Sequence, residues 1–229
     1  MTPARAAILG AFLALGFLLP HGLVLAQPQA PRPDAGRPLA ADTGPIIRPD
    51  VQEGDQWVYR RTGDGAPRAL RQTITRRVVQ GISLLTEVSD SADTTVTVYD
   101  RSWGLIGSGF NDYRPPLAYY SFPLYAGKRW GIDSEVSNFG AGQTGRMRGE
   151  GRAVAWEEIQ VPAGRFTTLR IEVRIETTDP GDAARTLTVS ETHWYARNVL
   201  RPVRVVSESR VGAEAARSET IELVSYRLE

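Results

Sequence analysis

No cysteine occurs among the 229 residues of this chain. Its absence excludes disulfide frameworks, thiol nucleophiles, iron–sulfur clusters and cysteine-ligated zinc sites. A domain of roughly 200 residues must then be stable through its core alone, and a chain of that length can bury a sufficient core.

Histidine is almost as scarce, with only His21 and His193 in the sequence. A Ser-His-Asp triad would have to use His193, and the chain has neither a G-x-S-x-G nucleophile elbow nor a P-loop. One histidine with carboxylates would make an unusual zinc site, and EF-hand spacing is absent. We therefore expect no metal and no cofactor, and a binding or structural role is favoured over an enzymatic one.

An excess of one charge is also missing, because 27 Lys and Arg side chains face 26 Asp and Glu. Arg5 is the only charge in residues 1–26, so the remainder is formally neutral. This balance argues against a nucleic-acid partner. Lys128 is the single lysine. Either a GC-rich genome or anion recognition by arginine would produce that bias.

Residues 1–26 have the pattern of a secretory signal peptide. Arg5 gives the start a positive charge, residues 6–19 form an apolar run, and Val24-Leu25-Ala26 offers a cleavage site. We predict export to the periplasm or beyond, with a mature chain that begins at Gln27. The alternative is an uncleaved anchor, since the leader is about long enough to span a bilayer, and membrane association is expected only in that case.

The composition changes twice after the leader. Residues 27–50 are rich in proline, alanine, glycine and arginine and have few large apolar side chains, so we expect a disordered tether. Residues 51–229 contain no internal linker and are predicted to form a single antiparallel β domain.

Within that domain, strand-forming residues alternate with turn residues, and no segment has the period of a long amphipathic helix. The clearest alternation of apolar and charged side chains is at residues 169–176. About ten segments at hairpin spacing predict an all-β fold, an antiparallel curved sheet that closes into a barrel or half-barrel with little helix. The predicted strands lie at 56–60, 70–80, 82–88, 94–99 with a kinked continuation to 109, 130–136, 144–161, the segment after Gly164, 186–195, 199–210 and 219–228.

Two turns and one irregularity are predicted in the second half. Residues 161–164, Val-Pro-Ala-Gly, suit a tight turn with proline second and glycine fourth. Asn198 suits a turn because asparagine tolerates the left-handed conformation. Residues 144–161 change their apolar phase, which predicts a β-bulge near Glu157-Glu158. Adjacent carboxylates point to opposite faces of a strand, so that pair is a poor acid and base.

Aromatic side chains supply the candidate ligand-binding residues. The proline-rich aromatic segment from residue 114 to 127 is either a lid over an apolar cavity or, as we favour, a hydrophobic plug at the end of a barrel. The five tryptophans either line a cavity or fill the core. The candidates for a ligand site are Trp130, Trp156, Trp194, Tyr195, Tyr119 and Phe122.

Glu191, His193 and Tyr195 share one face of a predicted strand. If that face points inward, Glu191 and His193 enter the interior together and are the weak candidates for acid–base chemistry. Two structural alternatives remain open. The strand could turn so that Trp194 packs inward, or the pair could be a buried, satisfied hydrogen bond.

Three motifs carry a family resemblance: residues 123–130 with Pro-Leu-x-x-Gly-x-x-Trp, residues 161–166 with Val-Pro-Ala-Gly-x-Phe, and Trp194-Tyr195-Ala196. Together they resemble an uncharacterised family of exported bacterial β-rich proteins (TapB-like), over residues 120–228. That family is similar to half-barrel carriers of the lipoprotein-carrier type, which implies an antiparallel sheet around an apolar interior. The chain departs from the family after Ala196, where residues 197–202 stand in place of a glycine-containing turn. The resemblance supplies no catalytic residue.

The sequence thus favours an exported envelope protein that binds an apolar small molecule, a lipid or an envelope protein. The first alternative is a structural or interaction module with a filled core. The second is a hydrolase that uses Glu191 and His193.

Overall fold

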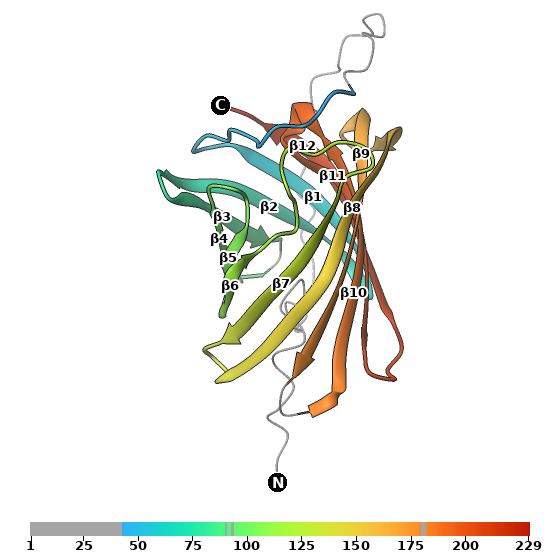
Figure 1. Ribbon diagram of the computed structural model, residues 1–229. Helices are drawn as coiled ribbons and strands as arrows, with labels where there is room; N and C mark the ends of the chain where they lie inside the picture. Colours follow the sequence, from blue (N-terminus) through green and yellow to red (C-terminus); the bar gives the residue numbers. More distant parts are fainter. Residues whose placement is uncertain (1–42, 90, 93, 180–181) are drawn as a thin grey trace, which may run out of the picture.

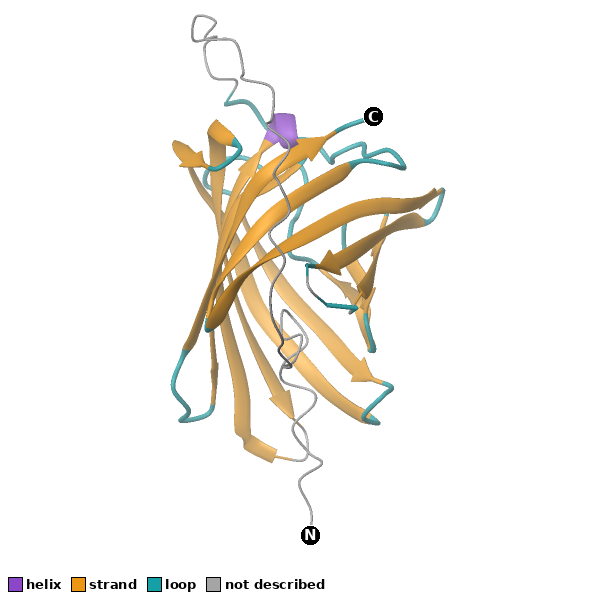
Figure 2. Cartoon of the chain, turned by 180° about the vertical axis from the view of Figure 1, so that it is seen from behind, coloured by secondary structure: helices purple, strands orange, loops and turns teal. Residues whose placement is uncertain are grey.

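The alternation at residues 169–176 lies in a strand of 16 residues, Gly164–Asp179. The computed structural model describes residues 43–229 apart from 90, 93 and 180–181. These residues form strands and one short 3-10 turn (Figures 1 and 2). No helix in this described part is long and apolar enough to cross a membrane. The predicted signal peptide lies outside it.

The strands form a closed barrel in which each pairs antiparallel with its sequence neighbours and the last pairs with the first. This is the up-and-down arrangement, in which closure removes the exposed sheet edges. The prediction of an all-β antiparallel sheet is confirmed, and the sheet is a full barrel rather than a half-barrel. The strands are β1 (Gln56–Gly63), β2 (Gly65–Val78), β3 (Gly81–Val88), β4 (Thr94–Asp100), β5 (Leu105–Ser108), β6 (Asn111–Leu117), β7 (Arg129–Asn138), β8 (Gln143–Val161), β9 (Gly164–Asp179), β10 (Asp182–Ala196), β11 (Arg201–Val211) and β12 (Arg217–Arg227).

The strand count exceeds the predicted ten because the segment 105–117 forms β5 and β6. The sequence analysis treated 105–109 as a continuation of the preceding strand and 114–117 as irregular. Ladder pairing between β6 and β7 ends at Arg114, directly before Pro115 and Pro116. Proline has no N–H to donate, so the pattern of a strand is obscured at this point.

The inner face of the barrel is apolar along β9. Leu169, Ile171, Val173 and Ile175 are all buried, as the alternation predicts. Inward side chains of the other strands join them in two apolar clusters, and Tyr99 packs against both. The core therefore lies inside the sheet.

The predicted phase change in β8 is present, but its position differs. The register between β8 and β9 shifts between Ala153 and Ala155 rather than at Glu157-Glu158. After the shift Trp156 lies opposite Leu169. The sequence contained apolar residues in both phases over 153–161, so several positions for the bulge fitted the pattern equally well.

The two predicted turns have different outcomes. Val161 pairs with Gly164 across a two-residue turn, as predicted. At the second turn the chain forms η1 (Arg197–Val199), and the left-handed residue is Leu200, with φ 63°, rather than Asn198. The backbone N–H of Leu200 donates to the carbonyl of Arg197, which closes the 3-10 turn.

The chain packs on the barrel before residue 51. Ile46 is 2% exposed and exchanges two backbone hydrogen bonds with Leu124, at 2.7 and 2.8 Å. Residues 43–50, which the sequence analysis placed in the tether, thus lie against the upper end of the barrel in Figure 1. The rest of the predicted tether lies outside the described residues.

Gly149 of β8 marks a close approach to β9, and its substitution is a direct test of the barrel wall. A Cβ at Gly149 would lie 1.9 Å from the carbonyl oxygen of Arg174. Gly149→Ala should therefore force the two strands apart and lower the free energy of unfolding by about 2 kcal/mol or more. Chemical denaturation measures the change.

Gly131 of β7 is the matched control, because a Cβ there meets no atom within 4 Å. Gly131→Ala should leave the stability unchanged within about 0.5 kcal/mol. Equal stability of the two variants would contradict the close packing of β8 on β9.

Candidate functional site

The loop between β6 and β7 covers one end of the barrel. This plug loop, residues 118–128, contains Leu124, which is fully buried, and the partly buried Tyr119, Tyr120 and Phe122 that pack on the core clusters. Most of its large side chains thus point into the barrel. The loop is a plug, which is the alternative that the sequence analysis favoured.

Several polar contacts hold the plug loop in place. The ammonium group of Lys128, the only lysine, donates to the carbonyls of Ser121 and Pro123, the latter at 2.9 Å. The indole N–H of Trp130 donates to the carbonyl of Ala118 at 3.0 Å. A Cβ at Gly151 would lie 2.2 Å from the Trp130 ring, so this glycine leaves the space that the indole occupies.

A hydrogen-bonded chain joins the plug loop to the barrel wall. Glu191 and His193 of β10 point inward and are 7% and 6% exposed. His193 Nε2 lies 2.8 Å from a carboxylate oxygen of Glu191, and His193 Nδ1 lies 2.5 Å from the hydroxyl of Tyr120. The ring of Tyr119 stacks on the imidazole, with centroids 6.2 Å apart.

The environment of Tyr120 keeps its hydroxyl group protonated. Burial raises the pKa of Tyr120 well above its ordinary value, although Arg201 opposes the shift. The phenol therefore keeps its proton and can donate to His193 Nδ1, in the tautomer whose Nε2–H donates to Glu191. Both ring nitrogens are thus satisfied, and we interpret the chain as a buried structural latch, one of the two structural alternatives above.

A second pair of ionisable groups lies elsewhere on the inner wall. The guanidinium Nε of Arg61 is 3.1 Å from a carboxylate oxygen of Glu219. Glu219 of β12 lies in register with Glu191 of β10, because both are paired with Ser207 of the intervening strand β11. Burial raises the pKa of Glu219 to about 7, Arg61 opposes this shift, and the charge of Glu191 adds to it.

Arg201 is a cation among aromatic rings in the same interior. Its guanidinium carbon lies 5.5 Å from the ring centroid of Trp57 and 5.7 Å from that of Trp103. One N–H donates to the side-chain carbonyl of Gln72 at 2.8 Å. Among the described residues no carboxylate pairs with it, so the rings supply most of the compensation for its burial.

A hollow of about 620 Å³ opens beside the plug loop. We call it the mouth hollow. Tyr120 and Phe122 from the plug loop form one wall, and Ile47, which is 76% exposed, forms another. Its full lining is Ile47, Arg48, Asp100, Ser102, Gly104, Pro116, Ala118, Tyr120, Ser121 and Phe122. Asp100 is already engaged, since its carboxylate accepts the N–H groups of Ser102 and Gly104 at 2.7 and 2.8 Å.

The structure separates the residues that the sequence grouped as a ligand site. Only Phe122 lines the mouth hollow. Tyr195 is buried against Tyr120 and Phe122, and Tyr119 lies against His193. Trp130 and Trp156 pack on the second apolar cluster inside the barrel.

Trp194 lies on the opposite face of β10 from His193 and Tyr195. Its indole N–H donates to Glu157 at 3.1 Å, and the guanidinium of Arg204 lies 5.6 Å from its ring. It is therefore not part of any surface shared with Trp130 and Trp156. The strand keeps its regular alternation at 191–195, which is why Trp194 and His193 point to different faces.

Sequence reasoning missed Tyr120, Arg201 and Glu219. Nothing in a linear pattern links Tyr120 to His193, 73 residues later. The inward phase of β11 and β12 was also not assigned, although Ile221 and Leu223 share a face with Glu219. That spacing could have marked Glu219 as an inward carboxylate.

Comparison with known proteins assigns no family. The sequence matches no protein-family model and no curated protein significantly. Among solved structures, a candidate lipoprotein of Parabacteroides distasonis is 15% identical, with 80% of this chain and 97% of that one covered and a TM-score of 0.46. A candidate exported protein of Bacteroides fragilis with a YmcC-like fold is 15% identical, covering 80% and 100%, with a TM-score of 0.48.

The hypothetical lipoprotein YmcC of Escherichia coli is 13% identical, covering 75% of this chain and 83% of that one, with a TM-score of 0.43. These three structural neighbours are described as lipoproteins or as an exported protein. The TapB-like relationship itself stays a prediction.

The latch can be tested by removal of one hydroxyl. Tyr120→Phe keeps the ring and leaves His193 Nδ1 buried without a donor, so we expect the free energy of unfolding to fall by about 1–2 kcal/mol. Tyr125→Phe is the control in the same loop, because Tyr125 is 47% exposed. Denaturant titration should show a change below about 0.5 kcal/mol for the control. An unaffected Tyr120→Phe protein would rule out the latch.

The raised pKa of Glu219 predicts a pH dependence of stability. The folded state holds this proton up to about pH 7, whereas the unfolded chain releases it near 4.5. Folding therefore takes up a proton between these values, and the free energy of unfolding falls as the pH rises from about 4.5 to about 7. Glu219→Gln should flatten this part of the profile, measured by denaturation at a series of pH values.

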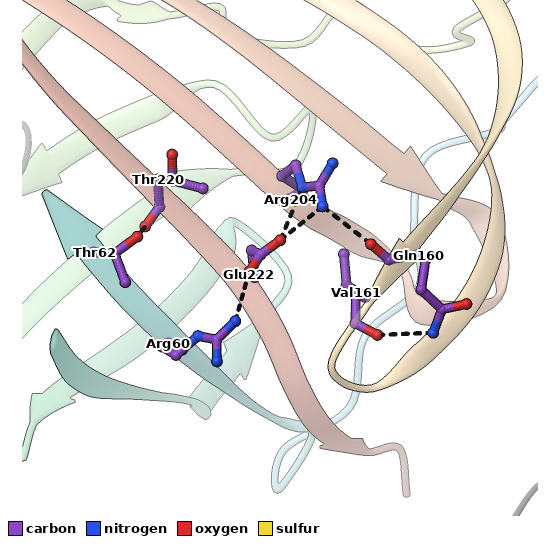
Figure 3. Close-up of polar contacts among 7 residues, drawn as sticks. All are labelled: Arg60, Thr62, Gln160, Val161, Arg204, Thr220 and Glu222. Atoms are coloured by element: carbon purple, nitrogen blue, oxygen red, sulfur yellow. Dashed lines mark hydrogen bonds and ion pairs between the residues drawn. The ribbon is translucent and has the colours of Figure 1, made fainter.

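Glu222, three residues along β12, is a control with the opposite sign. It lies on the outer face between Arg60 and Arg204, at 2.8 and 2.7 Å (Figure 3). Burial alone would raise the pKa of Glu222, but the hydrogen bonds from Arg60 and Arg204 outweigh it and lower the pKa. Glu222→Gln should therefore change the slope of the profile only below about pH 4.5, where the unfolded chain takes up a proton at this carboxylate before the folded protein does. Parallel profiles of wild type and Glu219→Gln above that pH would refute the assignment for Glu219.

Proposed function

We propose that this chain is an exported protein of the cell envelope that binds a small, largely apolar ligand in the mouth hollow without transforming it. The observation that carries the proposal is the hollow itself, with its walls of Tyr120, Phe122 and Ala118 and its polar rim. Ligand sites are commonly apolar recesses of roughly 300–1,000 Å³ with a few polar groups.

The walls of the mouth hollow are held before any ligand arrives. Tyr120 is tied to His193, and Ala118 is tied through its carbonyl to Trp130. Phe122 packs on Tyr195 with ring centroids 6.0 Å apart. A site whose side chains are already fixed loses little conformational entropy on binding, which favours a binding role.

The placement of Glu191 and His193 supports binding over hydrolysis. Neither residue lines the mouth hollow, and both are engaged in the latch. A general acid or base must come within hydrogen-bond reach of the reacting group. In this arrangement Tyr120 stands between the pair and the hollow.

The export signal supports an envelope location. Residues 1–26 have the n-region, apolar run and cleavage site of a secretory leader. The absence of cysteine suits a domain that depends on its core and its closed sheet rather than on disulfides. The structural-module reading competes with this one, because two apolar clusters already fill much of the interior.

Binding of a fluorescent apolar probe distinguishes a ligand-binding protein from a structural module. The neutral dye N-phenyl-1-naphthylamine should bind the purified protein with enhanced emission. Ala118→Trp places a large side chain in the mouth hollow and should weaken binding at least tenfold. Ala126→Trp makes the same substitution at an exposed position of the same loop that does not line the hollow, and should bind the dye like wild type.

A wild-type protein that does not bind the dye would favour the structural module. Equal binding by wild type and Ala118→Trp would show that the dye binds elsewhere, and would also overturn the proposal. If the dye does bind in the mouth hollow, native mass spectrometry of the protein purified from its own envelope would identify the natural ligand.

A further inference from the structure

A second hollow, of about 610 Å³, lies next to the mouth hollow on the same end of the barrel. It is formed where the segment 48–51 passes the turn between β2 and β3 and Arg101 of the turn between β4 and β5. Both turns are at the upper left of Figure 1. We define the rim patch as Ile47, Arg48, Arg77, Val78, Val79 and Arg101.

The rim patch exposes apolar side chains at the tip of a turn. Val79 is 70% exposed and Val78 is 41% exposed, and both line the second hollow. Ile47, 76% exposed, faces the mouth hollow on the other side of Arg48. Three large aliphatic side chains thus stand in water around two recesses, where nothing in the described structure covers them.

The same surface is positively charged. Three arginines but only one carboxylate, Asp50, line the second hollow. Asp50 pairs with Arg77. Arg48 and Arg101 have no carboxylate partner among the described residues, and Arg48 instead donates to the carbonyl of Arg101 at 2.6 Å. Two exposed guanidinium groups are therefore available to anions.

A bilayer with anionic lipids matches both properties at once. Aliphatic side chains enter the boundary between headgroups and acyl chains, and arginines beside them attract the negative surface. A soluble anion would use the arginines but not the valines, and an apolar protein surface would use the valines but not the arginines.

The opposite end of the barrel provides a comparison. Phe110 and Phe139, at the turns after β5 and β7, are 65% and 64% exposed. Their rings contact each other edge to face, with centroids 5.6 Å apart. Val96 of β4 and Ile106 of β5 are also exposed, and none of these four side chains is charged, so the cluster has no cation of its own.

We propose that the rim patch docks the barrel on the surface of a bilayer that contains anionic lipids. This interaction goes beyond the proposed binding function and does not depend on the leader segment. It places the opening of the mouth hollow at the membrane surface, because Arg48 lines both recesses.

Vesicle flotation tests the proposal with the exported chain after removal of its leader, a start at Gln27 being verified by mass spectrometry. Vesicles of phosphatidylcholine with phosphatidylglycerol should retain the protein, whereas vesicles of phosphatidylcholine alone should retain at least tenfold less. Raised salt should weaken the binding, since exposed charges are screened.

Three variants locate the contact. Val79→Asp, at a position that is 70% exposed, should reduce retention at least tenfold without loss of fold, as verified by circular dichroism. The double variant Arg48→Gln, Arg101→Gln should bind both vesicle types equally weakly, with little salt dependence. Phe139→Asp at the opposite end should bind like wild type.

Failure to float with anionic vesicles would overturn the proposal, as would a loss caused by Phe139→Asp and not by Val79→Asp. Dye binding distinguishes a failure of the membrane proposal from a failure of the proposed ligand-binding function. Val79→Asp should still bind N-phenyl-1-naphthylamine, and Ala118→Trp should still float with anionic vesicles.

Discussion

The pairing of β1 with β12 is the contact on which the rest of the structure depends. It joins Gln56–Gly63 to the strand that ends at Arg227, with one register shift between Val58 and Tyr59. Without it the sheet would have two free edges, whose unpaired N–H and C=O groups favour aggregation. Closure also fixes the side chains of β1 across the interior. The indole N–H of Trp57 donates to the carbonyl of Val199, and the hydroxyl of Tyr59 donates to that of Pro202.

In a closed barrel, successive side chains of each strand point alternately to the solvent and into the enclosed interior. A polar side chain in the inward phase must therefore find its partner inside the barrel. Here the partners come from distant parts of the chain: Tyr120 for His193, Arg61 for Glu219 and Gln72 for Arg201. The contact of Tyr120 with His193 places the plug loop. Gln72 and Arg201 join β2 to β11, which do not pair, and Arg61 and Glu219 join the paired strands β1 and β12. The polar interior thus helps to determine the geometry of the end at which the mouth hollow opens.

The parts of the fold that local patterns encode were predictable. The alternation at 169–176 predicted β9 and its buried face, the Val161–Gly164 turn has the predicted position, and the aromatic loop is a plug. The inward direction of Glu191 and His193 was left open, because direction depends on which face the closed sheet encloses. Prolines obscured β6, and two apolar phases in β8 left the position of its bulge undetermined. Tyr120 could not be paired with His193, because a loop without periodicity carries no information about its distant contacts.

The segment from Ile46 to Val51 connects the two recesses at the plugged end. It is held on one side by the backbone pair of Ile46 and Leu124, and on the other by the indole of Trp103, which donates to the carbonyl of Pro49 at 3.2 Å. Because both anchors are buried, the segment cannot shift without breaking contacts to the plug loop and to the turn after β4. Arg48 projects from this fixed segment into both recesses. An anion that pairs with Arg48 in one recess would therefore reduce the positive charge that the other presents, and the two proposed sites would be coupled through a single side chain.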